Sequence, residues 1–302
     1  MDASAKPPTA GESTAGRSAA GKQRSPLSRL LTVLIVLALI TGIGLIAYPI
    51  VSDLWNRTQQ TKAVGAYVAK TKDISLSRRK AMLKAARAYN RRLALAGEGR
   101  YKMTKAERHE YENLLDVTGT GIMGYLSIPK LGVELPIYHG TDESVLQIAI
   151  GHLPGTSLPV GGPGTHAAVS GHTGLPSAML LTGLDRMKKG DTFSYTVLGI
   201  TETYQVDRIS VVKPTDLSKL AIVDGKDLGT IITCTPYGVN NHRLLVRGHR
   251  IPTPDKGSHG QDMPINKFVI GEWSLLGLIL AMIIISLSIG IRRKKRRTIG
   301  GK

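Results

Sequence analysis

The chain has 302 residues, with 40 Lys and Arg against 22 Asp and Glu, and a formal net charge of +18. The excess is local, because residues 57–108 hold fifteen basic and three acidic residues while residues 124–268 hold thirteen and twelve. This distribution does not indicate a nucleic-acid-binding protein. The single cysteine, Cys234, excludes an intrachain disulfide and a zinc site built from several cysteines.

Two long apolar stretches stand near the ends of the chain. Residues 30–51 run for 22 positions without a charge, and residues 273–291 run for 19. Each could cross the roughly 30 Å hydrocarbon core of a bilayer as a helix. Basic residues precede the first stretch and follow the second, so the positive-inside rule predicts cytoplasmic termini and an extracellular segment between two spans. The first stretch is longer than the apolar part of a signal peptide, and we interpret it as a retained signal anchor.

Composition divides the chain into seven segments. They are a disordered cytoplasmic tail at 1–29, a transmembrane helix at 30–51, an extracellular helical, lid-like segment at 52–121, a β-rich domain at 122–251, a tether at 252–268, a second transmembrane helix at 269–291 and a basic cytoplasmic tail at 292–302. Membrane lipid is therefore one expected partner, and nucleic acid is not.

Helical signals fill the segment between the first span and the β-rich domain. Residues 53–95 contain no Pro and one Gly, and apolar residues recur at steps of three and four from Met82 to Leu93. Thr104 and Glu107 have the spacing of a capping box, in which each side chain satisfies a backbone N–H of the other residue. This spacing predicts a second, short helix that begins just after Thr104.

From Ile122 onward, short β-prone runs alternate with turn residues. The predicted strands are 122–128, 132–138, 165–171, 192–198, 203–212, 228–234 and 242–250, with helical patches at 143–149 and 177–187. The frequent turns favour a closed β-barrel over a parallel α/β sheet. The predicted fold class is therefore mainly β, a closed barrel with short helices, preceded by a helical segment and flanked by two transmembrane helices.

Cys234 follows a run of β-branched residues and precedes a Pro-Tyr-Gly turn, which predicts a thiol at the end of a strand. A lone cysteine can be a buried apolar residue, an intermolecular bridge or a reactive thiol. A nucleophilic thiol would need a base, because only a few per cent of a free thiol is ionised at neutral pH. His172 is the leading candidate, since it also leaves a β-prone run and enters a loop rich in Gly and Pro. Spacing alone leaves four other histidines open: His139, His166, His242 and His249.

Arg243 begins the next β-prone run, nine residues after Cys234. A hairpin-like return of the chain would bring its guanidinium beside the thiol, where a cation can face a developing oxyanion. Arg247 lies four residues further on and would point to the same face of a regular strand. No acidic cluster in the sequence indicates a metal site, and we expect no metal and no cofactor.

Three segments carry the motifs around these residues: 170–176 (SGHTGLP), 230–238 (TIITCTPYG) and 241–248 (NHRLLVRG). Together they resemble the sortases, the membrane-anchored cysteine transpeptidases of Gram-positive bacteria. The match is nearest to the class C branch, which assembles pili. Further stretches that agree are 121–125, 135–141 and 151–162. The resemblance covers roughly 105–250 and extends to the two-span layout typical of that branch.

The resemblance implies a sortase-type β-barrel in which Cys234 is the nucleophile, His172 the acid and base, and Arg243 the residue that holds substrate and stabilises the oxyanion. Cys234 would attack the Thr–Gly bond of a Leu-Pro-x-Thr-Gly-like sorting signal and form a thioacyl enzyme. In the pilus branch the amine acceptor is a pilin lysine, and in housekeeping sortases it belongs to the cell-wall precursor. The expected partners are therefore pilin or surface proteins that bear such a signal, together with one of these two acceptors.

The sequence departs from the pilus branch at the lid. Pilus sortases commonly carry an Asp-Pro-aromatic lid before the barrel, and this chain has no Pro between Pro49 and Pro129. Residues 96–104 occupy the corresponding place, with Tyr101 as a candidate substitute for the missing aromatic residue. Autoinhibition by a lid is therefore not part of the prediction.

A third hypothesis comes from a different functional class. The chain could be an inert, membrane-tethered β-barrel that binds wall polymer through its basic residues 57–108. The motifs around Cys234, His172 and Arg243 argue against that interpretation.

Overall fold

The computed structural model describes residues 26–254, and the chain divides between Ala47 and Tyr48 into two compact units. The first 25 residues, most of the tether, the second predicted transmembrane helix and the basic C-terminal tail lie outside the described residues. Helix α1 (Pro26–Lys72) starts in the first unit with a run of exposed apolar side chains. Among residues 26–254 it is the helix that is long and apolar enough to cross a membrane.

The first helix ends later than the sequence predicts. The prediction ended the span at Val51 and placed another helix over 53–95, whereas α1 runs unbroken through Pro49 to Lys72. The break comes three residues later at Ser75, a residue type that favours helix starts over helix interiors. Its side chain accepts a hydrogen bond from Arg78 N at 3.3 Å and caps α2 (Leu76–Leu95).

The predicted apolar stripe and capping box are both confirmed. Along α2, Ala86, Tyr89 and Leu93 are buried. Thr104 Oγ1 accepts a hydrogen bond from Glu107 N at 3.3 Å, and Glu107 Oε2 accepts one from Thr104 N at 2.7 Å. This reciprocal pair starts α3 (Lys105–Asn113) and satisfies two backbone N–H groups that a helix start leaves open.

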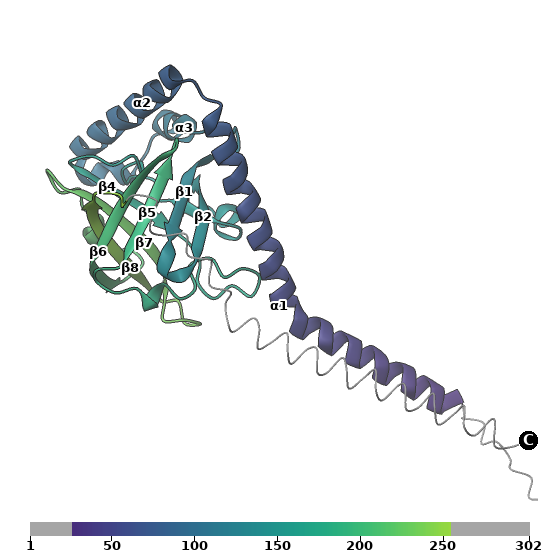
Figure 1. Cartoon of the computed structure of the whole chain (residues 1–302). Coiled ribbons are helices and arrows are strands. Elements are labelled where there is room, and N and C mark those ends of the chain that lie inside the picture. Colours follow the sequence, from purple (N-terminus) through teal and green to yellow (C-terminus); the bar gives the residue numbers. More distant parts are fainter. Residues whose placement is uncertain (1–25, 255–302) are drawn as a thin grey trace, which may run out of the picture. The chain divides into compact units, whose positions relative to one another are not determined.

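Within the described residues, eight strands form a closed barrel (Figure 1). They are β1 (Ile122–Ile128), β2 (Val133–His139), β3 (Ile150–His152), β4 (Thr165–Ser170), β5 (Thr192–Val197), β6 (Ile200–Val212), β7 (Asp227–Thr235) and β8 (His242–Ile251). Their order around the barrel is β1-β2-β3-β4-β7-β8-β6-β5, and pairing of β5 with β1 closes it. The β2–β3 and β4–β7 pairs are parallel and the others are antiparallel. The predicted mainly β, closed-barrel fold is confirmed.

Two parts of the sequence prediction differ from this barrel. Strand β3 was not predicted, because three residues are too few to show a period-two pattern. The helical patch at 177–187 is wrong: residues 177–183 form turns and irregular backbone, and only Leu184–Arg186 form a short 3-10 helix. Gly183, the residue before this 3-10 helix, has φ +89°, a left-handed conformation that interrupts a helix. The other patch contains α4 (Glu143–Leu146).

A pair of glycines sets the spacing inside the barrel. Gly229 of β7 and Gly248 of β8 are direct cross-strand partners. A Cβ on Gly229 would lie 3.0 Å from the Tyr195 ring, and one on Gly248 would lie 3.0 Å from the Phe193 ring. The rings of Phe193, Tyr195 and Tyr204 pack with centroids 5.4–5.6 Å apart. Both glycines are therefore required because the aromatic rings occupy the space that a side chain would need.

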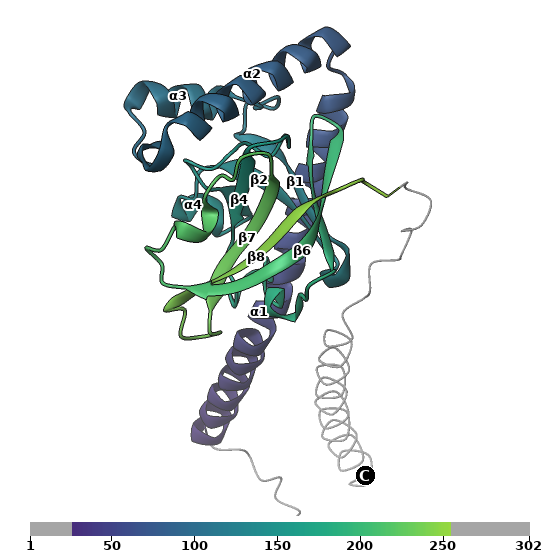
Figure 2. The same ribbon diagram turned by 90° about the vertical axis from the view of Figure 1, so that its left-hand side faces the viewer.

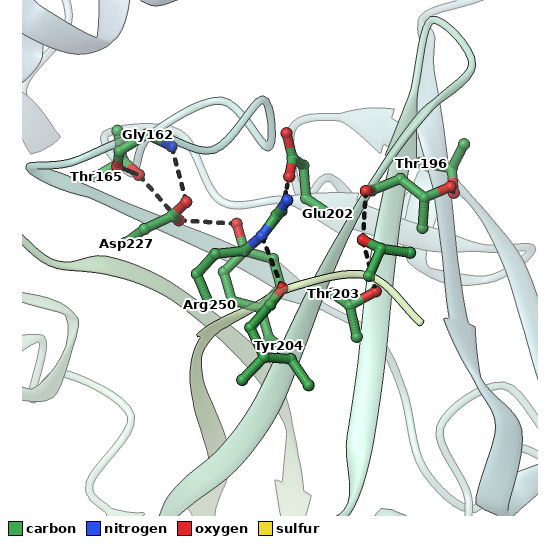
Figure 3. A network of polar contacts seen from close by, with 11 residues as sticks. Gly162, Thr165, Thr196, Glu202, Thr203, Tyr204, Asp227 and Arg250 are labelled. Carbon is green, nitrogen blue, oxygen red and sulfur yellow. Dashed lines mark hydrogen bonds and ion pairs between the residues drawn. The ribbon is translucent and has the colours of Figure 1, made fainter. Parts of the chain in front are cut away.

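A polar network stands where β7 begins, at the end of that strand away from Cys234 (Figure 3). Asp227 accepts hydrogen bonds from Gly162 N at 2.8 Å and from the Tyr204 hydroxyl at 2.9 Å. Burial raises the pKa of this carboxyl group, and these donors oppose the rise. Nearby, Arg250 forms an ion pair with Glu202. The network ties the loop before β4 to three strands, β6, β7 and β8.

Helices α2 and α3 lie at the same end of the barrel (Figures 1 and 2). The Asn90 side chain of α2 donates to Leu158 O at 3.0 Å and accepts from Leu158 N at 2.8 Å. The Tyr111 hydroxyl of α3 lies 3.0 Å from His152 Nδ1 and accepts from Gly140 N at 3.0 Å. Both contacts are buried, so they substitute for lost water and fix the helices to the barrel loops.

We predict that Tyr111→Phe lowers the free energy of unfolding by about 1–3 kcal/mol, because it leaves buried groups of His152 and Gly140 without a partner. Tyr89→Phe is the matched control. Its hydroxyl is buried and has no hydrogen-bond partner in the described residues, so its loss should be neutral or slightly stabilising. Urea unfolding of the chain in detergent measures both. Equal effects of the two substitutions would contradict the role assigned to the Tyr111 hydroxyl.

Candidate active site

Cys234 lies next to the last residue of β7, directly opposite Arg243 in the antiparallel ladder with β8. Its neighbour Ile231 packs in the main core inside the barrel, whereas Ile232 packs in a second apolar cluster with Leu245. Side chains alternate along a strand, so Cys234 shares the face of Ile232 and not the barrel interior. The thiol is partly exposed. The predicted nucleophile and the predicted oxyanion residue therefore sit side by side on the outer face of the sheet.

His172 follows β4, the parallel neighbour of β7. Gly171 N donates to Ile232 O at 3.1 Å, and the Thr233 hydroxyl donates to Gly171 O at 2.8 Å. These bonds hold the residue before His172 against the two residues before Cys234. The pairing thus brings His172 to the strand end that carries the thiol, although the two residues are far apart in the chain.

The loops that follow these two strand ends also touch each other. Gly174 adopts φ +74°, and a Cβ there would lie 2.6 Å from the Tyr237 ring. Tyr237 belongs to the β7–β8 turn, while Gly174 belongs to the loop after His172. The glycine is needed both for its backbone conformation and for this close approach. The contact joins the turn that precedes Arg243 to the loop that carries His172.

Glu143 is the residue near this site that sequence reasoning missed. Its Oε1 atom lies 3.6 Å from His172 Nε2, within reach of an ion pair when the imidazole is protonated. Within the described residues, His172 Nε2 is buried and has no hydrogen-bond partner. Glu143 is the first residue of α4 and its side chain is 70% exposed. No motif could have identified it, because the β2–β3 connection alone brings it near the loop after β4.

The two arginines of β8 have different surroundings. Arg243 Nη1 donates to Asn240 O at 3.2 Å and to His242 O at 3.1 Å, which holds the guanidinium over the β7–β8 turn. Arg247 instead pairs with Asp207 through two bonds of 3.0 and 2.8 Å. Such a bidentate pair occupies the donors that an oxyanion would need. Arg243 is therefore the better placed of the two for chemistry at Cys234.

The four alternative histidines have other contacts. His166 is buried, with Nδ1 2.8 Å from Ala221 O and Nε2 2.7 Å from the Thr230 hydroxyl. The nitrogens of His139 lie 2.9 Å from Gly121 O and 2.7 Å from Leu114 O. His242 contacts the neighbouring Asn241 side chain, and His249 is 3.9 Å from Asp207. Of the five candidates, His172 alone follows the strand that pairs beside Cys234 in parallel.

The segment expected at the place of a lid forms a 3-10 helix, Gly97–Tyr101. Arg100 Nη2 donates to Leu220 O at 3.1 Å, and its guanidinium carbon stands 4.7 Å from the centre of the Tyr101 ring. A Cβ on Gly155 would lie 2.6 Å from that ring. Leu220 belongs to the β6–β7 loop that covers the apolar cluster of Ile232. These contacts connect the segment to the wall of the site. The sequence did not predict that this segment covers Cys234, and none of these contacts reaches the thiol.

Metal-ligand residues do not gather in the described part of the chain. Among residues 26–254, no group of three or more His, Cys, Asp or Glu side chains is arranged to hold a metal ion. The side chains gathered around Cys234 offer a thiol, an imidazole, a guanidinium and one nearby carboxylate.

Comparisons with known proteins agree with this geometry. The family model described as the sortase domain matches residues 126–251. The crystal structure of sortase C1 from Streptococcus agalactiae is 49% identical with a TM-score of 0.62, covering 64% of this chain and 100% of that one. The structure of Streptococcus pneumoniae sortase C is 40% identical with a TM-score of 0.58, covering 64% and 97%.

A curated relative is more distant. Sortase A of Streptococcus agalactiae serotype III (strain NEM316) is 31% identical over 117 residues, which cover 38% of this chain and 47% of that protein. The chain thus spans about half the length of this relative. Together the barrel, the site and these matches define the class: this chain belongs to the sortase family of cysteine transpeptidases.

We predict that two buried histidines make the fold sensitive to acid. Desolvation by burial lowers the pKa of His152 and of His166 from 6.5 to about 4. Between these values the unfolded chain binds more protons than the folded chain, so the free energy of unfolding falls as pH falls from 6.5. At pH 5 the loss is about 2 kcal/mol for each histidine.

Urea unfolding of the chain in detergent at pH 7.5 and pH 5.0 measures this loss. His166→Gln removes one of the two groups, and its difference between the two pH values should be smaller by about 2 kcal/mol. An unchanged difference in that variant would show that His166 does not contribute.

Proposed function

We propose that this chain is a membrane-anchored cysteine transpeptidase that cleaves a Leu-Pro-x-Thr-Gly-like sorting signal and transfers the acyl group to a pilin lysine. The observation that carries this proposal is the register of β7. Cys234 is the direct cross-strand partner of Arg243, and β4, the other neighbour of β7, leads into His172. Nucleophile, base and oxyanion stabiliser are the three groups that acyl transfer through a thioester needs.

In the first half-reaction, the thiol proton of Cys234 passes to His172 and the sulfur attacks the Thr carbonyl carbon of the sorting signal. The carbonyl oxygen becomes an oxyanion, which the Arg243 guanidinium stabilises. When the tetrahedral intermediate collapses, the Thr–Gly C–N bond breaks. His172 gives its proton to the leaving glycine amine, and a thioester to Cys234 remains.

In the second half-reaction, a lysine ε-amine attacks the thioester carbonyl. The amine gives a proton to His172, the C–S bond breaks, and the sulfur of Cys234 takes the proton back. The product is an isopeptide bond between the sorting-signal Thr and the lysine. Both half-reactions balance in atoms and electrons with Cys234, His172, Arg243 and the two substrates, so the proposed transfer needs no further reactant.

The substrate preference has support from the face on which Cys234 lies. Ile232 and Leu245 form an apolar cluster on that face, with Leu217 and Leu220 of the β6–β7 loop packed against it. The cluster lies one side-chain step along β7 from the thiol, because Ile232 precedes Cys234 by two residues. We propose that the apolar Leu and Pro of the sorting signal bind beside this cluster.

Two acceptors have support from different relatives. Two of the similar solved structures are sortase C enzymes, and the Streptococcus pneumoniae structure is described as giving insight into the pilin substrate specificity of that protein. This favours a pilin lysine. The curated relatives include sortase A, which favours the second candidate, attachment of surface proteins to a peptidoglycan precursor. Membership of the enzyme family disfavours an inert wall-binding barrel.

For the membrane arrangement we propose two spans with cytoplasmic ends and an extracellular barrel. The apolar start of α1 would be the first span. The second span is the sequence segment 269–291, and basic residues flank both on the proposed cytoplasmic side. This arrangement puts the thiol where secreted substrates and wall components are found.

We predict that Cys234→Ala and His172→Ala each abolish cleavage of a fluorogenic sorting-signal peptide, because each removes one half of the nucleophile and base pair. Arg243→Ala should lower kcat by about 10²–10³-fold, the usual cost of losing one oxyanion donor. His249→Ala is the matched control: its side chain is 47% exposed on β8 and it should retain wild-type turnover. Turnover by the Cys234→Ala chain would refute the catalytic assignment.

We predict that the full chain in proteoliposomes converts a purified pilin into a ladder of covalent multimers that survives boiling in detergent. Replacing the acceptor lysine of the pilin should stop the ladder, because the isopeptide bond needs that amine. A peptidoglycan-precursor peptide supplied in parallel serves as the competing acceptor. Conjugation to that peptide without any pilin ladder would favour the housekeeping function.

A further inference from the structure

We propose that Asp53 and Asn56 of α1 are positioning residues that hold the loop carrying His172. The proposal rests on the role of His172 proposed above. Both residues lie on one turn of α1, about one turn before Gln60, whose side chain bonds to Ile148 O. The loop in question is residues 171–182, between β4 and the 3-10 helix at Leu184–Arg186.

Three hydrogen bonds connect this turn of α1 to the loop. The Asn56 amide donates to Ser177 O at 2.8 Å, and the Ser52 hydroxyl donates to the same oxygen at 3.1 Å. Asp53 Oδ1 accepts a hydrogen bond from Met179 N at 2.8 Å. Neighbouring backbone groups of an irregular loop therefore find their partners on a helix and not on the loop itself.

The carboxylate of Asp53 is also held by a contact within α1. Its other oxygen, Oδ2, pairs with Arg57 Nε at 2.7 Å, one turn later on the same helix. The Asp53 side chain is 16% exposed, so water competes little for Oδ1. The ion pair with Arg57 thus orients Asp53 Oδ1 toward Met179 N. It also compensates the negative charge of a carboxylate that is mostly removed from water.

The anchored part of the loop is connected back to His172. Leu181 N donates to His172 O at 3.1 Å, and Gly174 N donates to the Thr182 hydroxyl at 3.0 Å. A Cβ on Gly171 would lie 2.9 Å from a methyl carbon of Leu181, so that side chain packs directly under the start of the loop. The hydrogen bond from Leu181 to His172 thus joins the two ends of the loop, and α1 bonds to Ser177 and Met179 in its middle.

This arrangement explains how a loop with exposed and half-exposed residues can present a histidine in one orientation. Acid–base transfer between two side chains depends on geometry within fractions of an ångström. Without the α1 contacts, residues 173–179 would keep the hydrogen bonds within the loop, the contact of Gly174 with Tyr237 and the packing of Leu175 and Ala178 against the core. The same helix continues at its N-terminal side into the apolar segment, so the element that anchors the chain is also the element that orders the His172 loop.

The test measures peptide cleavage by the full chain in detergent micelles. We expect Asp53→Ala and Asn56→Ala each to lower kcat about five- to tenfold, with KM changed less than about twofold, because the chemical step depends on the alignment of His172. Asp53→Asn should restore most of kcat, since its amide oxygen can still accept the hydrogen bond from Met179 N. The urea unfolding midpoint is measured in the same variants. If kcat fell only because the fold was destabilised, kcat and the midpoint would fall together in Asp53→Ala and recover together in Asp53→Asn.

Gln60→Ala is the matched control. Gln60 is a buried residue of α1 whose amide donates to Ile148 O at 2.8 Å, a contact of the same kind that does not reach the His172 loop. It should leave kcat unchanged. An equal fall in kcat for Gln60→Ala, or wild-type kcat for both Asp53→Ala and Asn56→Ala, would overturn the proposal.

Hydrogen exchange measured by mass spectrometry separates this proposal from the proposed function. Exchange in residues 173–182 should rise in Asp53→Ala and Asn56→Ala but not in Gln60→Ala, whether or not the chain cleaves peptide. If the wild-type chain does not cleave the sorting-signal peptide, the proposed function is refuted. A loop whose exchange is the same in all four chains refutes the positioning contact.

Discussion

The register of β7 between its two neighbours is the constraint on which the candidate site depends. With β8 it fixes Cys234 opposite Arg243, and with β4 it fixes the strand end from which His172 emerges. A slip of one residue would turn Cys234 toward the barrel interior and Thr233 outward. The glycine pair Gly229 and Gly248 opposes such a slip, because a side chain moved to either position would meet the aromatic rings. The packing of the core and the chemistry of the surface are thus set by one alignment.

The histidines of the barrel differ in their surroundings, and the difference bears on the proposed chemistry. His152 and His166 are buried with both ring nitrogens near oxygen partners, so they stay neutral and act as rigid connectors between loops. His172 differs from them in that its Nε2 atom has no hydrogen-bond partner among the described residues. Its nearest ion-pair partner is Glu143 at 3.6 Å, so no hydrogen bond to the protein occupies the nitrogen that we propose transfers the proton. The distinction lies in the surroundings and not in the sequence next to each histidine.

Much of the barrel could be predicted from the sequence, because β-branched runs and turn residues mark strands locally. Seven of the strands were found within a few residues, and the spacing of Thr104 and Glu107 identified the capping box. Strand β3 was missed because it has three residues, and the break before Ser75 was missed because neither Gly nor Pro marks it. Glu143 and the α1 contacts to residues 177–179 could not be predicted, since both depend on how distant segments are placed by the barrel. The motifs around Cys234, His172 and Arg243 indicated the family, and strand pairing supplied their proximity.

The solitary thiol has a practical consequence for studying this protein. Because Cys234 is the single cysteine among 302 residues, a thiol reagent can modify the chain at one position. The mass added by an alkylating reagent therefore counts accessible copies of Cys234 directly, and a reporter dye placed there needs no background substitutions. It also means that a disulfide between two copies of the chain can form only through Cys234. Under the proposed function, such a disulfide-linked dimer would be inactive in both copies until a reductant separates them.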